Sequence, residues 1–129
     1  MLRCALLAAT VLAAVLIASP AGAQAPRNFP ATALRGELVV TAPPEALLNR
    51  QPARLAPGSR LRDQNNRLLL SGAALGQRLV VHYTLDLQGQ LLDVWVLTPA
   101  EAARKPWPAT PAEAAAWSFN ADTQTWSKP

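Results

Sequence analysis

The chain has 129 residues, carries 12 cationic and 8 acidic side chains for a net charge of +4, and is half hydrophobic. This length supports one domain with a single modest core and is too short for two. With one cysteine and one histidine in the whole chain, a disulfide-bonded scaffold and a metal site made of several Cys or His ligands are both excluded.

The N-terminal residues have the three parts of a secretory signal peptide. Arg3 supplies a positive charge, residues 4–18 form an apolar run, and Ala21-Gly22-Ala23 is an A-x-A-type cleavage site. The run falls short of the roughly 20 apolar residues that a membrane-spanning helix needs. We therefore expect cleavage after Ala23, with Ala25 as the alternative, and a periplasmic or secreted protein without a transmembrane anchor.

After the signal peptide over 1–23, we expect an extended lead-in over 24–35 and then a β-rich domain over 36–98. Short apolar runs of this domain alternate with Gly, Pro and Asn at spacings near ten residues, which is typical of a small antiparallel barrel or sandwich. Strands are predicted at Glu37–Thr41, on both sides of a turn at Asn49-Arg50, at Arg60–Arg62 and at Arg67–Leu70, with further turns at Pro57-Gly58 and Asp63–Asn66.

The clearest pattern lies between Gly76 and Thr98, where two apolar runs flank a Gly-bearing turn and predict a β-hairpin. We expect a four-residue loop from Asp86 to Gly89, in which Asp86 starts a type I turn and Gly89 is left-handed. Alternation along the strands then predicts these core-facing rows: Leu79, Val81, Tyr83 and Leu85 on the first strand, and Leu92, Val94 and Val96 on the second.

In the same register Tyr83 pairs with Leu92, and His82 pairs with Asp93 on the mixed face of the hairpin. A histidine beside a carboxylate is the arrangement of a general base. No second histidine, cysteine or activated nucleophile accompanies it after the signal peptide, and no Gly-rich phosphate loop or metal-ligand spacing occurs. We therefore expect no catalytic residue, cofactor or metal. The alternative is a small periplasmic enzyme or enzyme inhibitor that uses the face carrying His82 and Asp93.

The C-terminal residues 99–129 predict short helices and a Trp-rich tail. The sequence Thr-Pro-Ala-Glu-Ala-Ala starts at Thr98 and again at Thr110. Each copy has Thr as an N-cap, Pro at the first helical position and Glu three residues after the cap, so two helix starts are expected. Residues 117–126 are expected to form a small hairpin that brings Trp117 near Trp126.

Cationic side chains are concentrated in the first half of the chain after the signal peptide. Eight arginines and three carboxylates lie between Arg27 and Arg78, and the planar guanidinium group suits phosphate and carboxylate partners. Arg54, Arg60 and Arg62 are therefore possible anion-binding residues, the alternative being that arginines protect exposed strand edges. No aromatic residue is interleaved with them, so nucleic acid is not an expected partner.

Four tryptophans are many for so small a domain. Exposed indole rings form sugar-stacking or protein-binding surfaces. Trp95 and Trp107 are possible interaction residues on this basis. We favour a packing role, in which tryptophans fill the space between the C-terminal tail and the mixed face of the hairpin.

The run from Leu47 to Arg62, with Asn65-Asn66, Leu75-Gly76-Gln77 and residues 94–99, resembles a group of small exported proteins of Gram-negative bacteria. For that group we know of no activity, so the resemblance implies only an exported location. The spacing of short strands is also similar to exported OB-like barrel domains, although Arg50 stands where their turn usually has Gly. Together these features predict a monomeric, non-enzymatic binding or accessory module that binds an envelope protein or an anionic envelope component.

Overall fold

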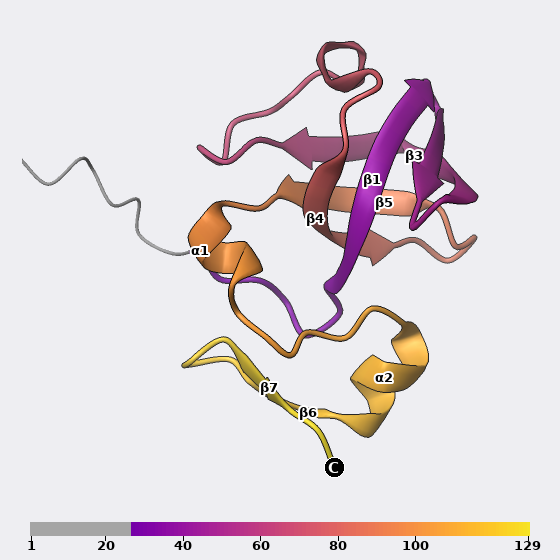
Figure 1. Cartoon of the computed structure of the whole chain (residues 1–129). Helices are drawn as coiled ribbons and strands as arrows, with labels where there is room; N and C mark the ends of the chain where they lie inside the picture. Colours follow the sequence, from indigo (N-terminus) through magenta and orange to yellow (C-terminus); the bar gives the residue numbers. More distant parts are fainter. Residues whose placement is uncertain (1–26) are drawn as a thin grey trace, which may run out of the picture.

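The computed structural model describes residues 27–129, and the predicted signal peptide over 1–23 lies outside the described residues. Five strands form a barrel, and a C-terminal cap (residues 99–129) covers one end of it (Figure 1). The strands are β1 (Leu34–Ala42), β2 (Glu45–Leu48), β3 (Gln51–Arg62), β4 (Leu79–Leu85), β5 (Leu91–Val96), β6 (Ser118–Asn120) and β7 (Thr125–Ser127). The helices are the 3-10 helix η1 (Ser71–Ala74), α1 (Pro99–Ala102) and α2 (Pro111–Ala116).

The barrel strands follow one another in the closed order β1-β2-β3-β5-β4, and β4 pairs with β1. Neighbouring strands are antiparallel except β3 and β5, which are parallel. A closed ring with an odd number of strands cannot alternate direction all the way round, so one parallel pair is required. The prediction of a mainly β fold is confirmed, and the structure is a barrel rather than a sandwich.

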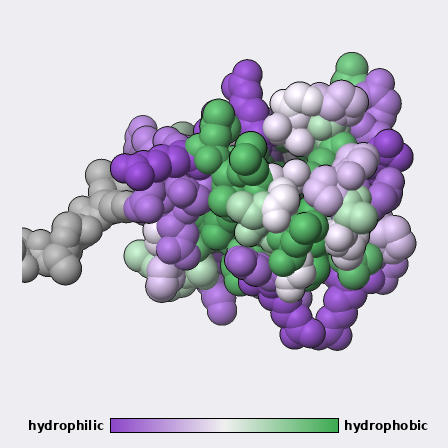
Figure 2. Space-filling view, turned by 90° about the horizontal axis from the view of Figure 1, so that it is seen from above, coloured by the Kyte–Doolittle hydropathy of each residue, from purple (hydrophilic) through white to green (hydrophobic). Residues whose placement is uncertain are grey.

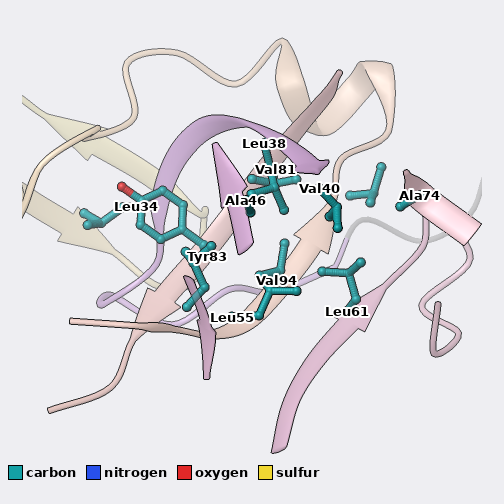
Figure 3. Packing of buried hydrophobic residues seen from close by; sticks show 12 residues of the cluster. Leu34, Leu38, Val40, Ala46, Leu55, Leu61, Ala74, Val81, Tyr83 and Val94 are labelled. Atoms are coloured by element: carbon teal, nitrogen blue, oxygen red, sulfur yellow. The ribbon is translucent and has the colours of Figure 1, made fainter. Parts of the chain in front are cut away.

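Aliphatic side chains fill the barrel interior, with Tyr83 as its one aromatic ring (Figure 3). All five strands contribute to this interior, because alternate residues of each strand point inward. The buried cluster consists of Leu34, Leu38, Val40, Ala46, Leu55, Leu61, Ala74, Val81, Tyr83, Leu91, Val94 and Val96. The predicted inward positions of Val81 and Tyr83 are confirmed.

The predicted turn residues of the β4–β5 hairpin are confirmed, but the loop has five residues, Asp86 to Gln90, instead of four, because Leu85 pairs with Leu91. The backbone N–H of Gly89 donates to the carbonyl of Asp86 at 3.1 Å, and Gly89 has a φ of 78°. The Asp86 carboxylate accepts from the backbone N–H groups of Gln88 and Gln90, each at 2.9 Å. An acidic residue at the start of a type I turn and glycine at its left-handed position therefore define the turn.

The predicted register of this hairpin is wrong by two residues over most of its length. Tyr83 pairs with Val94 instead of Leu92, and His82 pairs with Trp95 instead of Asp93. The five-residue loop shifts the register by one residue. A bulge adds the second, because between the Tyr83–Val94 and Leu85–Leu91 pairs β5 has one more residue than β4. Leu91 is consequently buried, whereas Leu92, predicted to face the core, is 36% exposed.

Two further predictions in the segment between β2 and β4 are wrong. Pro57-Gly58 does not end a strand, because β3 continues through it with a register shift between Leu55 and Arg60. Gly58 has a φ of 76°, which lets the strand bend without a turn. Arg67–Leu70 does not form a strand either, and only an isolated bridge joins Leu68 to Arg62.

The predicted turn at Asn49-Arg50 is confirmed. Asn49 and Arg50 have φ values of 51° and 65°, as the two central residues of a type I′ hairpin turn require. The Asn49 side chain accepts a hydrogen bond from the backbone N–H of Glu37 at 2.9 Å. This bond offsets the cost of a left-handed arginine, because it fixes the turn against β1.

Both predicted helix starts of the cap are confirmed. The Thr98 side chain accepts from the backbone N–H of Glu101, whose side chain accepts from the N–H of Thr98, so a complete capping box begins α1. Thr110 accepts from the N–H of Glu113 in the same way at the start of α2. The tail hairpin forms from β6 and β7, but the ring opposite Trp126 is Phe119 rather than Trp117.

Candidate functional site

A cluster of aromatic and polar side chains lies between the barrel and the cap, and we call it the joint. It contains Arg27, Phe29, Arg35, His82, Trp95, Glu101 and Trp107. Its aromatic part stacks on His82, which belongs to the outer face of β4. The His82 ring lies 4.1 Å from the Trp107 ring in a stacked arrangement and 4.4 Å from the Phe29 ring in an edge-on one. His82 has no exposed surface because the cap and the residues before β1 cover it.

The guanidinium of Arg35 holds His82 in one protonation state. Its Nε and Nη2 lie 3.3 and 3.1 Å from His82 Nε2. Arginine only donates, so Nε2 is assigned as the acceptor and the ring proton to Nδ1, which has no hydrogen-bond partner among the described residues. Burial, and then the charge of Arg35, lower the pKa of His82 to about 3, against the opposing effect of Glu101.

In this environment His82 is buried and its pKa is lowered. A general base must reach a substrate proton by a hydrogen bond, and His82 is fully enclosed. Asp93, predicted to lie opposite it, instead has its carboxylate 3.7 Å from Arg62, and Trp95 occupies the position across from His82. The structure therefore does not bring together the two residues on which the alternative enzymatic function depends.

A second arginine, Arg27, fastens the start of α1 to the barrel. Its Nε and Nη2 donate to the two carboxylate oxygens of Glu101 at 3.0 and 2.7 Å. Arg27 also donates to the carbonyls of Asp63 and Val96. Burial raises the pKa of Glu101, but hydrogen bonds from Arg27 and Thr98 and the charge of Arg27 outweigh it, so the pKa is lowered.

Arg35 fastens the other end of α1. It donates to the backbone carbonyls of Glu101, Ala102 and Arg104 at 2.9, 3.0 and 2.7 Å. The last carbonyls of a helix have no partner within the helix, so this guanidinium satisfies them and meets the negative end of the helix. The hydrogen bonds of Arg35 are thus made to His82 and to carbonyls at the end of α1.

Beside the joint lies an open hollow of about 520 Å³, which we call the cap hollow. It is lined by Arg35, Lys105, Pro106, Trp107, Trp117 and Lys128. Arg35 lies over the Trp107 ring, with 5.6 Å from guanidinium carbon to ring centroid, and the Lys128 ammonium lies 5.2 Å from the centroid of Trp117. No carboxylate side chain is among the lining residues, so this surface is cationic and aromatic.

The structure separates the three predicted anion-binding arginines from the cap hollow. Arg54 is exposed and forms an ion pair with Glu45 at 3.1 Å. Arg60 is exposed on β3, and Arg62 is half-buried next to Asp93 and 6.0 Å from the centroid of the Trp95 ring. Carboxylates therefore already neutralise part of the charge of this set, and its role in anion binding stays a prediction.

The two predicted tryptophans both lie in the joint. Trp107 is 6% exposed and its indole N–H donates to the carbonyl of Ala33 at 3.0 Å. Trp95 is half-buried, with its ring 5.5 Å from that of Phe29 in an edge-on contact. These contacts agree with a packing role, in which the tryptophans fill the space between the C-terminal tail and the sheet.

Sequence reasoning missed the residues that form the exposed part of the cap hollow. Trp117, Lys105 and Lys128 are separated along the chain, and none of them was predicted to bind a ligand. A cation within two residues of a tryptophan occurs at Lys105 with Trp107 and at Lys128 with Trp126. That pairing was the available signal, but the fold of the cap decides which rings the lysines approach.

Within residues 27–129 no group of three or more His, Cys, Asp or Glu side chains is placed to hold a metal ion. Among the helices of the same residues, none has both the length and the apolar character needed to cross a membrane. No protein-family model matches the sequence, and no similar curated protein or solved structure was found.

Proposed function

We propose that the protein is an exported, non-enzymatic binding module of the cell envelope, and that an acidic sugar binds in its cap hollow. The cap hollow carries the proposal, because it combines two exposed lysines with the half-buried indole of Trp117 and has no acidic lining residue. Export rests on the features of residues 1–23. The closed barrel of five strands supports the likeness to OB-like domains.

Different lining residues of the cap hollow suit different parts of an acidic sugar. Arg35 and Trp107 also belong to the joint, where their donors are already engaged. Lys105 and Lys128 are exposed and have ammonium groups to offer to a phosphate or carboxylate. The amphipathic indole of Trp117 offers a flat face to the C–H side of a sugar ring.

The experiment is a titration of the protein, purified from the periplasmic fraction, with glucose 1-phosphate, followed by tryptophan fluorescence. Glucose and inorganic phosphate are tested alone to separate the contributions of ring and charge. We expect saturable binding of glucose 1-phosphate that weakens as salt screens the lysines. Replacing Lys105 and Lys128 together by Ala should weaken binding about tenfold or more.

The matched control is the triple variant Arg54, Arg60 and Arg62→Ala, which removes cations from β3 and leaves the cap hollow intact. We expect its affinity for glucose 1-phosphate to equal that of the unchanged protein. Loss of binding in the triple variant alone would move the anion site to the β3 arginines. An absence of saturable binding by the unchanged protein would contradict the proposed ligand class.

A further inference from the structure

A second surface lies at the opposite end of the barrel from α2 and the β6–β7 hairpin, in residues 67–80, which comprise most of the connection from β3 to β4, with η1, and the first two residues of β4 (Figure 1). We call it the leucine loop. Leu68 and Leu70 are 73% and 80% exposed, and Leu75 and Val80 are 49% and 47% exposed. Single exposed apolar residues are common on protein surfaces, but four within one short segment are not.

The leucine loop exposes these side chains because its backbone is fixed to the barrel. The N–H of Leu69 donates to the carbonyl of Leu61 at 2.7 Å, and the N–H of Gly76 donates to that of Val40 at 3.0 Å. Leu69 packs against the core and Ala74 is buried within it. With Leu69 pointing inward, its neighbours Leu68 and Leu70 are held outward, so their exposure is a property of the fold.

The charged side chains within the leucine loop are all cationic, and Asp63 lies beside its start, where its carboxylate accepts from the backbone N–H of Arg67 at 3.0 Å. Exposed Arg67 and Arg78 stand at its two ends, and no Asp or Glu occurs between Asp63 and Asp86. Seen from this end, apolar residues gather over the middle of the face and hydrophilic ones border it (Figure 2). An apolar centre with a cationic border complements a bilayer surface of anionic lipids.

The shape of the surface agrees with a bilayer partner. Two hollows reach the leucine loop, one lined in part by Ser71 and the other by Arg78 and Val80. Leu68, Leu70 and Leu75 line neither of these two hollows, and their exposure makes their side chains accessible to a bilayer. Projecting leucines enter the boundary between head groups and acyl chains, while arginines beside them meet lipid phosphates.

We propose that the leucine loop docks the protein reversibly on an anionic lipid bilayer. The surface is separate from the cap hollow, so this inference extends the proposed function without depending on its ligand. Docking by this end leaves the cap hollow, at the other end of the molecule, facing away from the membrane (Figure 1).

The test is co-sedimentation of the protein, purified from the periplasmic fraction, with vesicles of phosphatidylglycerol and phosphatidylcholine or of phosphatidylcholine alone. We expect preferential binding to the anionic vesicles, weakened by salt. The double variant Leu68→Ser and Leu70→Ser should bind them about tenfold or more weakly at unchanged thermal stability. Arg67→Ala with Arg78→Ala should remove the preference for anionic lipid.

Leu87→Ser is the matched control, because Leu87 is fully exposed in the β4–β5 loop, outside the leucine loop. It should bind vesicles as the unchanged protein does, and so should the Lys105 and Lys128→Ala variant. Competition by soluble glycerol phosphate would show a site for the free head group and overturn bilayer docking. The inference also fails if the unchanged protein binds no vesicles, if the leucine double variant binds normally, or if that variant only converts a dimer to a monomer.

Discussion

The barrel interior and the joint are two buried regions of opposite chemistry. The barrel interior is aliphatic apart from Tyr83, and its side chains come from strands that are hydrogen-bonded neighbours. The joint contains stacked rings and two arginines whose donors reach Glu101, His82 and main-chain carbonyls. The difference teaches that area buried from water stabilises the barrel, whereas the hydrogen bonds and the ion pair of Arg27 and Arg35 hold the cap against it.

The largest effect is expected from a substitution that leaves a cavity in the barrel interior. Leu38 is fully buried in β1, which pairs with both β2 and β4. Leu38→Ala should lower the free energy of unfolding by about 2 to 5 kcal/mol, through lost transfer energy and the cavity left behind. Denaturant unfolding measures it, and the β-sheet signal and the tryptophan signal should shift together. A loss below about 1 kcal/mol would contradict the assignment of this cluster as the main core.

A smaller and more local effect should follow from removing the charge of Glu101 in the joint. Glu101 and Arg27 have side chains only 3% and 13% exposed, so Glu101→Gln leaves a nearly buried guanidinium without its counter-ion. We expect a loss of about 2 kcal/mol. The near-ultraviolet circular dichroism of the joint tryptophans should change more than the far-ultraviolet signal of the barrel.

The control for that variant is Glu45→Gln. Glu45 and Arg54 form an ion pair of the same type, but their side chains are 57% and 56% exposed. Exposed pairs contribute little, so this change should alter stability by about 0.5 kcal/mol or less. Equal effects of the two substitutions would mean that the enclosure of Glu101 has no energetic consequence, which would remove the distinction between joint and surface.

The two regions also differ in how well the sequence predicts them. Alternation, the Asn49-Arg50 turn and the Asp86–Gly89 loop are local patterns, and they predicted the barrel strands and most of their inward faces. The register of the hairpin was not predictable in this way, because Gln90 extends the loop by one residue and the bulge near Leu92 adds another, and no turn signal marks either. Pro57-Gly58 was misinterpreted because a glycine with positive φ serves a bulge as well as a turn.

The joint escaped prediction because its contacts span long sequence separations. Arg27 meets Glu101, and Arg35 meets both His82 and the carbonyl of Arg104, from segments that are far apart in the chain. Sequence alternation marked His82 only as a residue of the mixed face, and nothing local indicates that a second layer covers that face. The packing role of the tryptophans was inferred, but their partners could be found only in the folded chain.

The finest difference between the regions is in their response to pH, because the barrel interior has no group that titrates in mild acid and the joint has His82. The folded pKa of His82 is about 3, set by burial and then by Arg35, and its ordinary value is 6.5. As pH falls below 6.5 the unfolded chain binds a proton that the folded chain does not. The stability present above pH 6.5 is therefore lost progressively toward pH 3.

Between pH 6.5 and 5, above the ordinary range of carboxyl groups, this histidine alone should reduce the free energy of unfolding by about 1.5 kcal/mol. His82→Gln keeps a polar acceptor for Arg35, and glutamine does not titrate. The variant should therefore flatten the slope of the free energy of unfolding against pH, even if it is less stable at neutral pH. Denaturant unfolding at several pH values measures the slope in both proteins. Parallel slopes would show that His82 titrates alike in the folded and unfolded chains, and so that the joint does not enclose it.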